Sequence, residues 1–467
     1  MNTSNQGRGT LHSGAFNFSS FIQSGVDPRT GSYSCNLALN EVLGNCLCGP
    51  SVTLALVFSA FNSRNSGLGT GWSLPMSSYN RTTHKLSLSS GTCYHVHTHG
   101  NTVSLLDKKL DTVKVHIRED TWVIEHKNGT VEELTRPSEE DDEWLPSKIF
   151  SPEGRYISFF YSIVEGQRLL RELRDQHQSL LRFEYESDNN WDSQPGLTLW
   201  PDSLLQARKF NFVIRDNWLR QISLTTRHGR EAAHWVFDYQ PSETAALLMT
   251  HVQTPAGAVE TLSYNLYGHA LPPGAPVEAV PVVTSWRIAP GAGQPAVVRE
   301  YEFSRHNYFG YGAGYLWSDN EDYLYQNASD YVYSATETMI AGAQSTRIER
   351  LYNRFHLMIS QQTTIGTKVQ RKLIDYHDAQ GKSFNEQPAI FQLQKSLSVT
   401  YYDMRSPQNA RTEITRTSYD SSGNLLETQS PTGGREINTY YDAAGETGCP
   451  ASPSGVVHFL RSKSVIP

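Results

Sequence analysis

Cysteine is scarce in this chain. Its 467 residues contain five cysteines, at positions 35, 46, 48, 93 and 449, an odd number scattered along the whole length. Such a set does not form the disulfide framework of a small secreted domain. Only one residue separates Cys46 from Cys48, whereas a zinc knuckle has two residues between its cysteines. We predict buried or idle thiols, with a metal or redox role as the alternative.

Long apolar segments are also missing. No run reaches the ~18 apolar residues that a membrane-spanning helix requires. The stretch from Met1 to Arg8 has no apolar core of the kind found in secretory signal peptides. We therefore expect no transmembrane segment. We expect a chain that is cytoplasmic before export and is secreted by a specialised route, without a standard signal peptide.

The chain has no excess of positive charge. It carries 40 Lys and Arg residues against 47 Asp and Glu residues, a net charge of −7, and the basic residues form no stripe. This balance argues against nucleic acid as a partner. Aromatic residues make up 11% of the chain and include 24 tyrosines, so disorder is excluded. Polar strands rich in tyrosine suit a sheet with solvent on much of both faces.

Convincing amphipathic helices are few, and strand signals are many. Residues 113, 115 and 117 are apolar and alternate with polar residues, which places them on one face of a strand. Asn128-Gly129 is a strong hairpin signal, and a second long hairpin is expected around Ile365-Gly366. Residues 271–295 are rich in Pro, Ala and Gly and are predicted to form a loop.

A short motif recurs near the C-terminus. It is a Tyr-Asp pair followed by two small residues and a glycine, found at Tyr419, Asp420 and Gly423 and again, 22 residues later, at Tyr441, Asp442 and Gly445. Tyrosine is expected to end a strand, Asp to open a turn with its side chain, and Gly to supply the positive φ that closes it. The intervening Ser430–Gly433 segment has Pro and Gly where a second turn needs them.

Degenerate copies of the unit occur earlier in the chain. They are marked by Pro-x-Gly turns at 152–154 and 255–257, and by Tyr376, Asp378 and Gly381 and then Tyr402 and Asp403. One unit cannot bury a face alone, so such units must stack. The predicted fold is all-β, a large antiparallel sheet built from degenerate copies of this unit.

The N-terminal region carries two further glycine-rich segments, about 40 residues apart. The first contains Asp27, Pro28 and Gly31, and the second contains Gly69, Gly71 and Trp72. Together with the Tyr-Asp repeats they resemble the Rhs/YD-repeat family, which includes bacterial polymorphic toxins and insecticidal toxin-complex proteins. Residues 1–15 are rich in Ser, Asn, Gly and Thr and are predicted to be a flexible N-terminus. The resemblance implies a β-rich cap (16–110) and a YD-repeat β-sheet shell (111–467), in which a large spiralling antiparallel sheet forms part of a hollow shell.

The resemblance also implies a function. A shell of this family encloses or presents a toxin polypeptide, acts sterically and needs no catalytic residue, so no enzymatic activity and no cofactor are expected. The implied partners are further YD repeats or a second shell chain, and the encapsulated toxin polypeptide. Shells of this family usually end in an autoproteolytic core segment with catalytic Asp residues and a variable toxin domain, and nothing here resembles either. A short strand at 456–460 is expected to leave an exposed edge that pairs with further repeats or another chain.

The sharpest constellation for chemistry is the strand Cys93 to His99. Period two places Cys93, His95, His97 and His99 on one face, where thiolate and imidazole are suitable zinc ligands. Four residues in a line nevertheless span roughly 20 Å, too far to share one ion. We predict a polar strand face and no metal site, with a metal-dependent enzyme as the less favoured alternative.

A binding module that recognises a cell-surface glycan or receptor is the second alternative. Trp191, Trp200 and Trp218 could stack on sugar rings, although core or loop anchoring is the preferred interpretation. The acidic run at 138–143 lacks the spacing of a calcium loop and is predicted to be a solvated loop. No Gly-x-Ser-x-Gly elbow of a serine hydrolase is present.

Overall fold

The structure is a computed structural model that describes residues 22–62, 66–136, 138, 140–164, 166–185, 192–203, 205–225, 231–244, 246–317, 322–326, 330–452 and 454–467. Almost all regular structure is antiparallel β, so the predicted fold class is confirmed. Over these ranges the helical elements are α1 (Tyr323–Gln326) and the 3-10 turn η2 (Phe384–Glu386). No helix in them is long and apolar enough to span a membrane. The segment 1–15 lies outside the described residues.

A small inner sheet comes first in the chain. It consists of β1 (Ile22–Val26), β2 (Tyr33–Leu43), β3 (Ser51–Ser59) and β4 (Trp72–Ser73). Burial alternates along β2, where Tyr33, Cys35 and Leu37 are buried and the residues between them are not. One face of this sheet is therefore apolar and must be covered by another layer.

A closed barrel of eight strands follows. Its members are β5 (Ser78–Asn80), β6 (Lys85–Ser87), β7 (Cys93–His99), β8 (Thr102–Leu105), β9 (Val113–Arg118), β10 (Thr121–His126), β11 (Val131–Thr135) and β12 (Glu143–Phe150). Pairing of β12 with β5 closes the ring. Tyr79 and Trp122 stack inside it at 3.7 Å between ring centroids, with Trp144 packed beside them.

The remaining strands continue from β12 as one antiparallel meander, the outer sheet. They are β13 (Tyr156–Val164), β14 (Gln167–Arg174), β15 (Ser179–Glu184), β16 (Gly196–Leu199), β17 (Arg208–Arg215), β18 (Trp218–Thr225), β19 (Glu231–Pro241), β20 (Leu247–Gln253), β21 (Val259–Ala270), β22 (Ala279–Ala289), β23 (Val297–Phe303), β24 (Val332–Ala341), β25 (Gln344–Asn353), β26 (Met358–Ile365), β27 (Lys368–Tyr376), β28 (Gln394–Asp403), β29 (Ser406–Tyr419), β30 (Leu425–Gln429), β31 (Arg435–Tyr440) and β32 (Leu460–Ile466).

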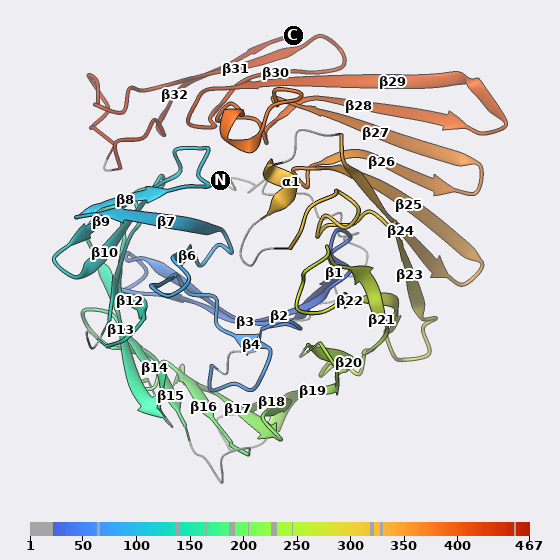
Figure 1. The fold of residues 1–467 in the computed structure, drawn as a ribbon. Helices are drawn as coiled ribbons and strands as arrows, with labels where there is room; N and C mark the ends of the chain where they lie inside the picture. The colour runs from blue at the N-terminus through green and yellow to red at the C-terminus, as the bar shows by residue number, and fades with distance from the viewer. Residues whose placement is uncertain are drawn as a thin grey trace.

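The outer sheet curves around the inner sheet. Figure 1 shows it passing below β1–β4, rising past β20–β23 and returning over the barrel with β28–β32. The main core fills the space between the inner sheet and strands β13–β23, and Phe58, Trp72, Phe212 and Phe237 are among its fully buried side chains. The right-handed twist between neighbouring strands accumulates over a long meander and bends it into such a curve.

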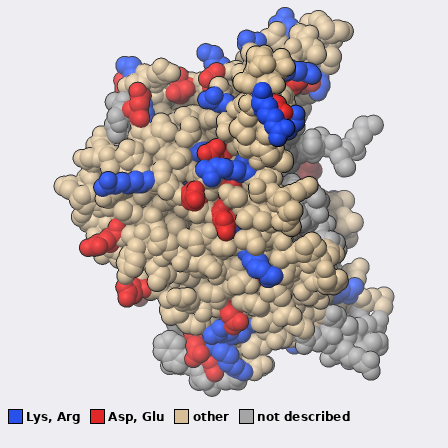
Figure 2. Space-filling model, turned by 90° about the vertical axis from the view of Figure 1, so that its right-hand side faces the viewer, with Lys and Arg blue, Asp and Glu red and all other residues tan. Residues whose placement is uncertain are grey.

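Charge is distributed without a stripe on the face shown in Figure 2. Lys and Arg side chains there are interspersed with Asp and Glu side chains and separated by uncharged surface. Many of the charges are paired across strands, as in Arg220 with Asp238 at 3.1 Å and Arg435 with Glu427 at 2.6 Å. Cross-strand pairs of this kind stabilise a sheet that has solvent on one side.

Two local predictions are wrong. Residues 271–295 are a loop only at their two ends, because β22 (Ala279–Ala289) runs through their middle as a strand in which Val282 and Val283 are buried. The last strand is not at 456–460 but at 460–466, and Val456 is a buried residue of the preceding loop. The expected boundary between residues 110 and 111 falls between β8 and β9, which both belong to the barrel.

Candidate functional site

A large hollow, the chamber, lies between the barrel and the returning outer sheet. Its volume is about 1820 Å³. One wall comes from β7 and the β8–β9 connection, and the other comes from the segment between β23 and β24 and from the region of η2. Figure 1 shows β7 facing α1 across this space. Segments more than 300 residues apart in the chain, from Thr83 to Gln392, therefore share one cavity.

Strand β7 presents its histidine face to the chamber. Val96 is buried in the barrel core and Tyr94 packs against that core, but both also line the chamber, together with Cys93, His95 and His97. His95 Nδ1 lies 2.6 Å from Asp107 Oδ2, which fixes the ring. The described part of the chain contains no group of three or more His, Cys, Asp and Glu side chains that could hold a metal ion. His99 continues the strand and is exposed, but it does not line the chamber.

The opposite wall is held by a second histidine pair. His356 Nε2 lies 2.7 Å from Asp322 Oδ2, and its Nδ1 lies 2.9 Å from the Tyr333 hydroxyl. This contact ties the segment carrying α1 to strands β24 and β25. Tyr325 in α1 stacks on Phe384 in η2 at 4.7 Å, so the two short helical elements brace each other.

Lys109 joins the two walls. Its ammonium donates to the carbonyl oxygens of Asn385 at 3.2 Å and Gln387 at 3.1 Å, and it lies 4.7 Å from the centre of the Phe384 ring. Burial lowers the pKa of Lys109 because removal from water disfavours its charged form. The charged ammonium is nevertheless stabilised by two carbonyl dipoles and by the face of the Phe384 ring.

Two more lysines of the barrel repeat this contact further along. Lys127 donates to Ser422 O at 2.8 Å and Asn424 Oδ1 at 2.7 Å, and Lys114 donates to Gly455 O at 3.4 Å. Burial lowers the pKa of Lys127, and the nearby Asp420 opposes the shift. We name Lys109, Lys114 and Lys127 the lysine seam, because they fasten the barrel to the β27–β28, β31–β32 and β29–β30 connections of the outer sheet, respectively.

The first Tyr-Asp motif forms the turn that Lys127 contacts. Tyr419 ends β29, and Asp420 Oδ1 accepts hydrogen bonds from the backbone N–H groups of Ser422 at 2.9 Å and Asn424 at 2.8 Å. Gly423 closes the turn with φ of +75° and donates its N–H to Asp420 O. The turn is rigid, and it presents its carbonyl groups to the seam.

The second copy has the same turn with a different tyrosine. Asp442 Oδ1 accepts from Ala444 N at 2.8 Å, and Gly445 has φ of +86°. Tyr441 follows β31, and Arg461 lies over its ring. It is Tyr440, the preceding residue, whose hydroxyl reaches back to Leu425 O at 3.1 Å.

The degenerate copies also sit at strand ends. Tyr376 ends β27 and donates to Met358 O at 2.9 Å, Asp378 follows in the connection, and Gly381 has φ of +72°. Tyr402 and Asp403 end β28. The hydrogen bond from Lys368 at 2.8 Å lowers the pKa of Asp403 to about 2. All these motif residues lie in the wall of the outer sheet.

A tyrosine contact that the sequence does not reveal recurs through that wall. A tyrosine hydroxyl donates to the carbonyl of the residue 15 positions earlier, on the preceding strand. The pairs are Tyr161 with Pro146, Tyr185 with Leu170, Tyr264 with Met249 and Tyr440 with Leu425. Burial raises the pKa of Tyr161, Tyr185 and Tyr264 well above the usual value. The sequence signal for this contact is a tyrosine that follows apolar strand residues. A search guided by the Tyr-Asp spacing alone does not find it.

The first N-terminal glycine-rich segment docks the inner sheet onto β22. Asp27 and Arg29 pair at 2.8 Å in the β1–β2 turn, with Pro28 between them. Gly31 O accepts the N–H of Val283 at 2.9 Å.

The second segment docks the inner sheet onto the β17–β18 turn. Gly69 has φ of +84° and lies so close to this turn that a Cβ would come within 2.8 Å of Leu219 N. Thr70 N donates to Asn217 O at 2.8 Å. Gly71 packs on Phe58, and Trp72 Nε1 donates to the Tyr239 hydroxyl at 2.7 Å. Both glycine-rich segments therefore join the inner sheet to the outer wall.

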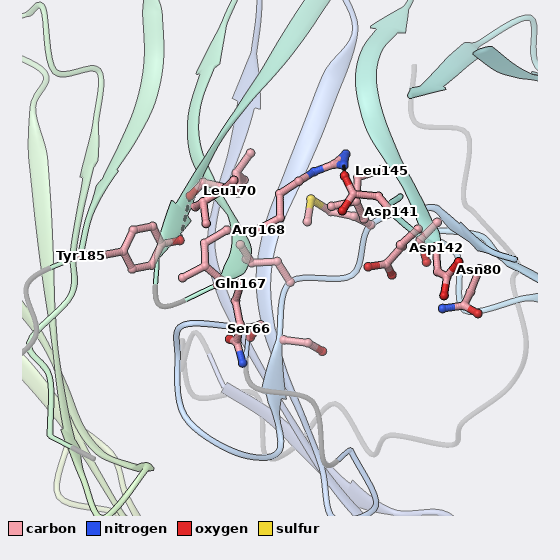
Figure 3. Close-up of a pocket in the computed structure, with 17 residues that line it drawn as sticks. Ser66, Asn80, Asp141, Asp142, Leu145, Gln167, Arg168, Leu170 and Tyr185 are labelled. Carbon is pink, nitrogen blue, oxygen red and sulfur yellow. Dashed lines mark hydrogen bonds and ion pairs between the residues drawn. The ribbon is translucent and has the colours of Figure 1, made fainter. Parts of the chain in front are cut away.

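A smaller pocket of about 470 Å³ lies where β5, β12 and β14 meet (Figure 3). Part of the acidic run lines it. Asp142 pairs with Arg81 at 2.7 Å, and Asp141 lies 3.9 Å from Arg168. Each of these two carboxylates therefore lies within ion-pair distance of an arginine.

The tryptophans considered for sugar stacking serve packing. Trp200 and Trp218 are partly buried and pack against the main core, which confirms the anchoring interpretation for both. Arg220 lies 5.0 Å from the Trp218 ring centre. Trp191 lies outside the described residues.

Comparison with known proteins gives matches among solved structures only. No family model and no curated sequence matches the chain. Its shape is similar to a crystal structure of TcdB2-TccC3-Cdc42 (10% identity, TM-score 0.31, 93% of this chain and 35% of that one) and to one of TcdB2-TccC3 (11%, 0.32, 95% and 37%). A third match is the Photorhabdus luminescens Tc holotoxin pore (12%, 0.32, 90% and 32%). The chain spans about a third of the length of these structures. Similarity at this level establishes neither a family nor a function.

Proposed function

We propose that this chain is a wall segment of a hollow β-shell of the Rhs/YD-repeat type, which encloses or presents a toxin polypeptide. One observation carries the proposal. A single antiparallel sheet leaves the barrel, curves around and is fastened back to the barrel by the lysine seam, with a chamber of about 1820 Å³ inside the closure. The motifs that resemble the family form the turns and docking contacts of this closure.

The proposed mechanism is steric. A continuous sheet satisfies the backbone hydrogen bonds of its own strands, so it forms a wall without holes. The carboxylates that line the chamber, Asp107 and Asp322, are each held by a histidine. Such a lining can enclose a polypeptide without reacting with it. In this proposal the chain contributes no catalytic residue and requires no cofactor.

The outer edge of β32 is the proposed junction to the rest of the shell. Every residue of β32 is exposed, and its recorded pairing is to β31. An exposed strand edge with free N–H and C=O groups pairs readily with another strand. We propose that further YD repeats or a second shell chain add there. The proposal places the assembled shell outside the producing cell, after export by a specialised route.

The test is enclosure itself. The chain would be produced with the polypeptides encoded beside it, and the assembly would be examined by electron microscopy and limited proteolysis. We expect a hollow particle with internal density, and an internal polypeptide that resists protease until the shell is denatured. If that polypeptide is cut as fast in the assembly as alone, the shell function is wrong.

A further inference from the structure

The chamber wall carries histidines that have no acidic partner. Three histidines line it: His84 in the turn before β6, and His95 and His97 on β7. His95 is matched by Asp107. His84 and His97 make no ion pair with any residue the structure describes, and His97 is exposed to solvent. Histidine is the side chain that changes charge between about pH 5 and 8.

The charges of the described lining residues can be counted. The other charged groups in the lining are Lys109, Asp107 and Asp322. Asp322 pairs with His356 behind the wall, and Lys109 donates to two carbonyls. The remaining titratable groups are Cys93 and the tyrosines 94, 308 and 325, which are neutral as thiol and phenol at acid pH. Over the described lining residues the fixed charges sum to −1, and each histidine that carries a proton adds one positive charge, which gives +2 for all three.

The shape of the lining favours an extended chain over a small molecule. Its volume of about 1820 Å³ exceeds the ~300–1,000 Å³ of ordinary small-ligand pockets. Residues 92–98 line it without interruption, a strand length of roughly 20 Å. Aromatic rings of Tyr308, Phe309 and Phe384 lie among the opposing residues and can cover an extended backbone.

We propose that the β7 wall of the chamber is an acid-switched binding surface for acidic polypeptide segments, with His84 and His97 as the switched contacts. The inference rests on the proposed function in naming the kind of polypeptide segment that the shell retains. Mild acidification turns the two unmatched imidazoles into cations beside Lys109, and carboxylates of an enclosed chain then pair with them. Above neutral pH the same wall offers only neutral imidazoles, so the segment is released.

The test measures binding to the full chain by fluorescence anisotropy at about pH 5.5 and about pH 8. The probes are labelled peptides of about twelve residues, one rich in Asp and one in which Asn replaces each Asp. Asp is preferred to Glu because its reference pKa of about 3.9 keeps it charged at the lower pH. We expect the Asp peptide to bind about five- to tenfold more tightly at the lower pH, the range that two partly exposed ion pairs provide. The Asn peptide should show no such gain.

Histidine variants test whether His84 and His97 are responsible for the tighter binding at the lower pH. The double variant His84→Gln, His97→Gln should lose the gain, whereas His99→Gln, on the same strand but outside the chamber, should keep it. His84→Lys, His97→Lys should bind the Asp peptide at both pH values. Thermal unfolding of each variant verifies that it folds.

Four results would overturn the inference: no binding at the lower pH, equal binding at both, retention of the gain in the Gln double variant, or equally tight binding of a single-stranded oligonucleotide. The last would mark a general polyanion surface. Because the probes are synthetic, these results are independent of the protease-protection experiment that tests enclosure.

Discussion

Lys127 and Asn424 lie 297 residues apart in sequence, and the lysine Nζ lies 2.7 Å from the asparagine Oδ1. The same ammonium donates to the carbonyl of Ser422, inside the turn built by Asp420. The contact joins the barrel to the clearest Tyr-Asp repeat. It shows that the closure of the curved sheet here depends on side chains, since strands β9 and β10 do not pair with β29 or β30.

Removal of that lysine should loosen the closure. Lys127→Met keeps the aliphatic stem but leaves Ser422 O and Asn424 Oδ1 without their donor. Hydrogen bonds to charged groups contribute about 1.5–3 kcal/mol, and we expect a loss of that size from the stability of the seam. Hydrogen exchange should accelerate in residues 417–430 and leave the main core unchanged. The control is Lys395→Met, at an exposed position of β28, and equal exchange in the two variants would contradict the role of the seam.

Glu260 should make stability decrease as pH rises. Burial raises the pKa of this carboxyl, although the Ser24 hydroxyl at 2.7 Å, the Tyr33 hydroxyl at 2.8 Å and Trp286 Nε1 at 2.9 Å oppose the shift. Between the unfolded pKa of about 4.3 and the higher folded value, the folded state binds more protons. The contribution of Glu260 is thus complete below the lower value and is lost as pH rises through the higher one.

Glu260→Gln keeps the shape and removes the titration. Urea midpoints measured from about pH 4 to pH 8 should fall more steeply for the natural chain than for the variant. If the plots of urea midpoint against pH are parallel for the natural chain and the variant, Glu260 has the same pKa in the folded and unfolded states. The Asp403→Asn variant, at the end of β28, is the control, because the lowered pKa of Asp403 places its contribution below the measured pH range.

The strands could be predicted because their signals are local. Alternation in β9, the Asn128-Gly129 turn and the Tyr-Asp turns each depend on a few adjacent residues. Strand β22 was missed because Pro281 and its small neighbours resemble a loop, although Val280 to Val283 form a buried β-branched run.

The chamber and the seam could not be predicted for a different reason. The small twists between neighbouring strands add up to the curvature of the outer sheet. This curvature determines which residue of the returning strands lies opposite Lys127. The partner of Tyr264 is a backbone carbonyl, which leaves no mark in the sequence. The alternation of side chains along a strand predicted the Cys93–His99 face, but it did not predict the cavity that this face lines.

The recurrent tyrosine contact should have a measurable stabilising effect at each position. Tyr264→Phe removes the hydroxyl that donates to Met249 O at 2.6 Å and leaves a carbonyl of β20 without that partner. We expect a loss of about 1–2 kcal/mol in the free energy of unfolding, the usual cost of a lost hydrogen bond in a partly buried site. Tyr267→Phe, on the same strand but 65% exposed, should cost less than about 0.5 kcal/mol. If the two changes lower the free energy of unfolding equally, the hydrogen bond of the Tyr264 hydroxyl does not stabilise the outer sheet.

His269 should limit stability in acid. It is 1% exposed in β21, its ring meets Phe303 and Phe309 edge to face, and neither ring nitrogen has a hydrogen-bond partner among the described residues. Burial lowers its pKa from 6.5 to about 4. The unfolded chain therefore binds the extra proton between these values, so stability is complete above about pH 6.5 and is lost as pH falls to about 4. A pKa shift of this size corresponds to about 3 kcal/mol.

His269→Phe fills the same space without a titrating group and should flatten the plot of unfolding free energy against pH over that interval, measured by urea unfolding. His99→Gln, at an exposed position, should leave that plot unchanged. If the acid dependence survives in His269→Phe, another group carries it and the buried ring is only a packing residue.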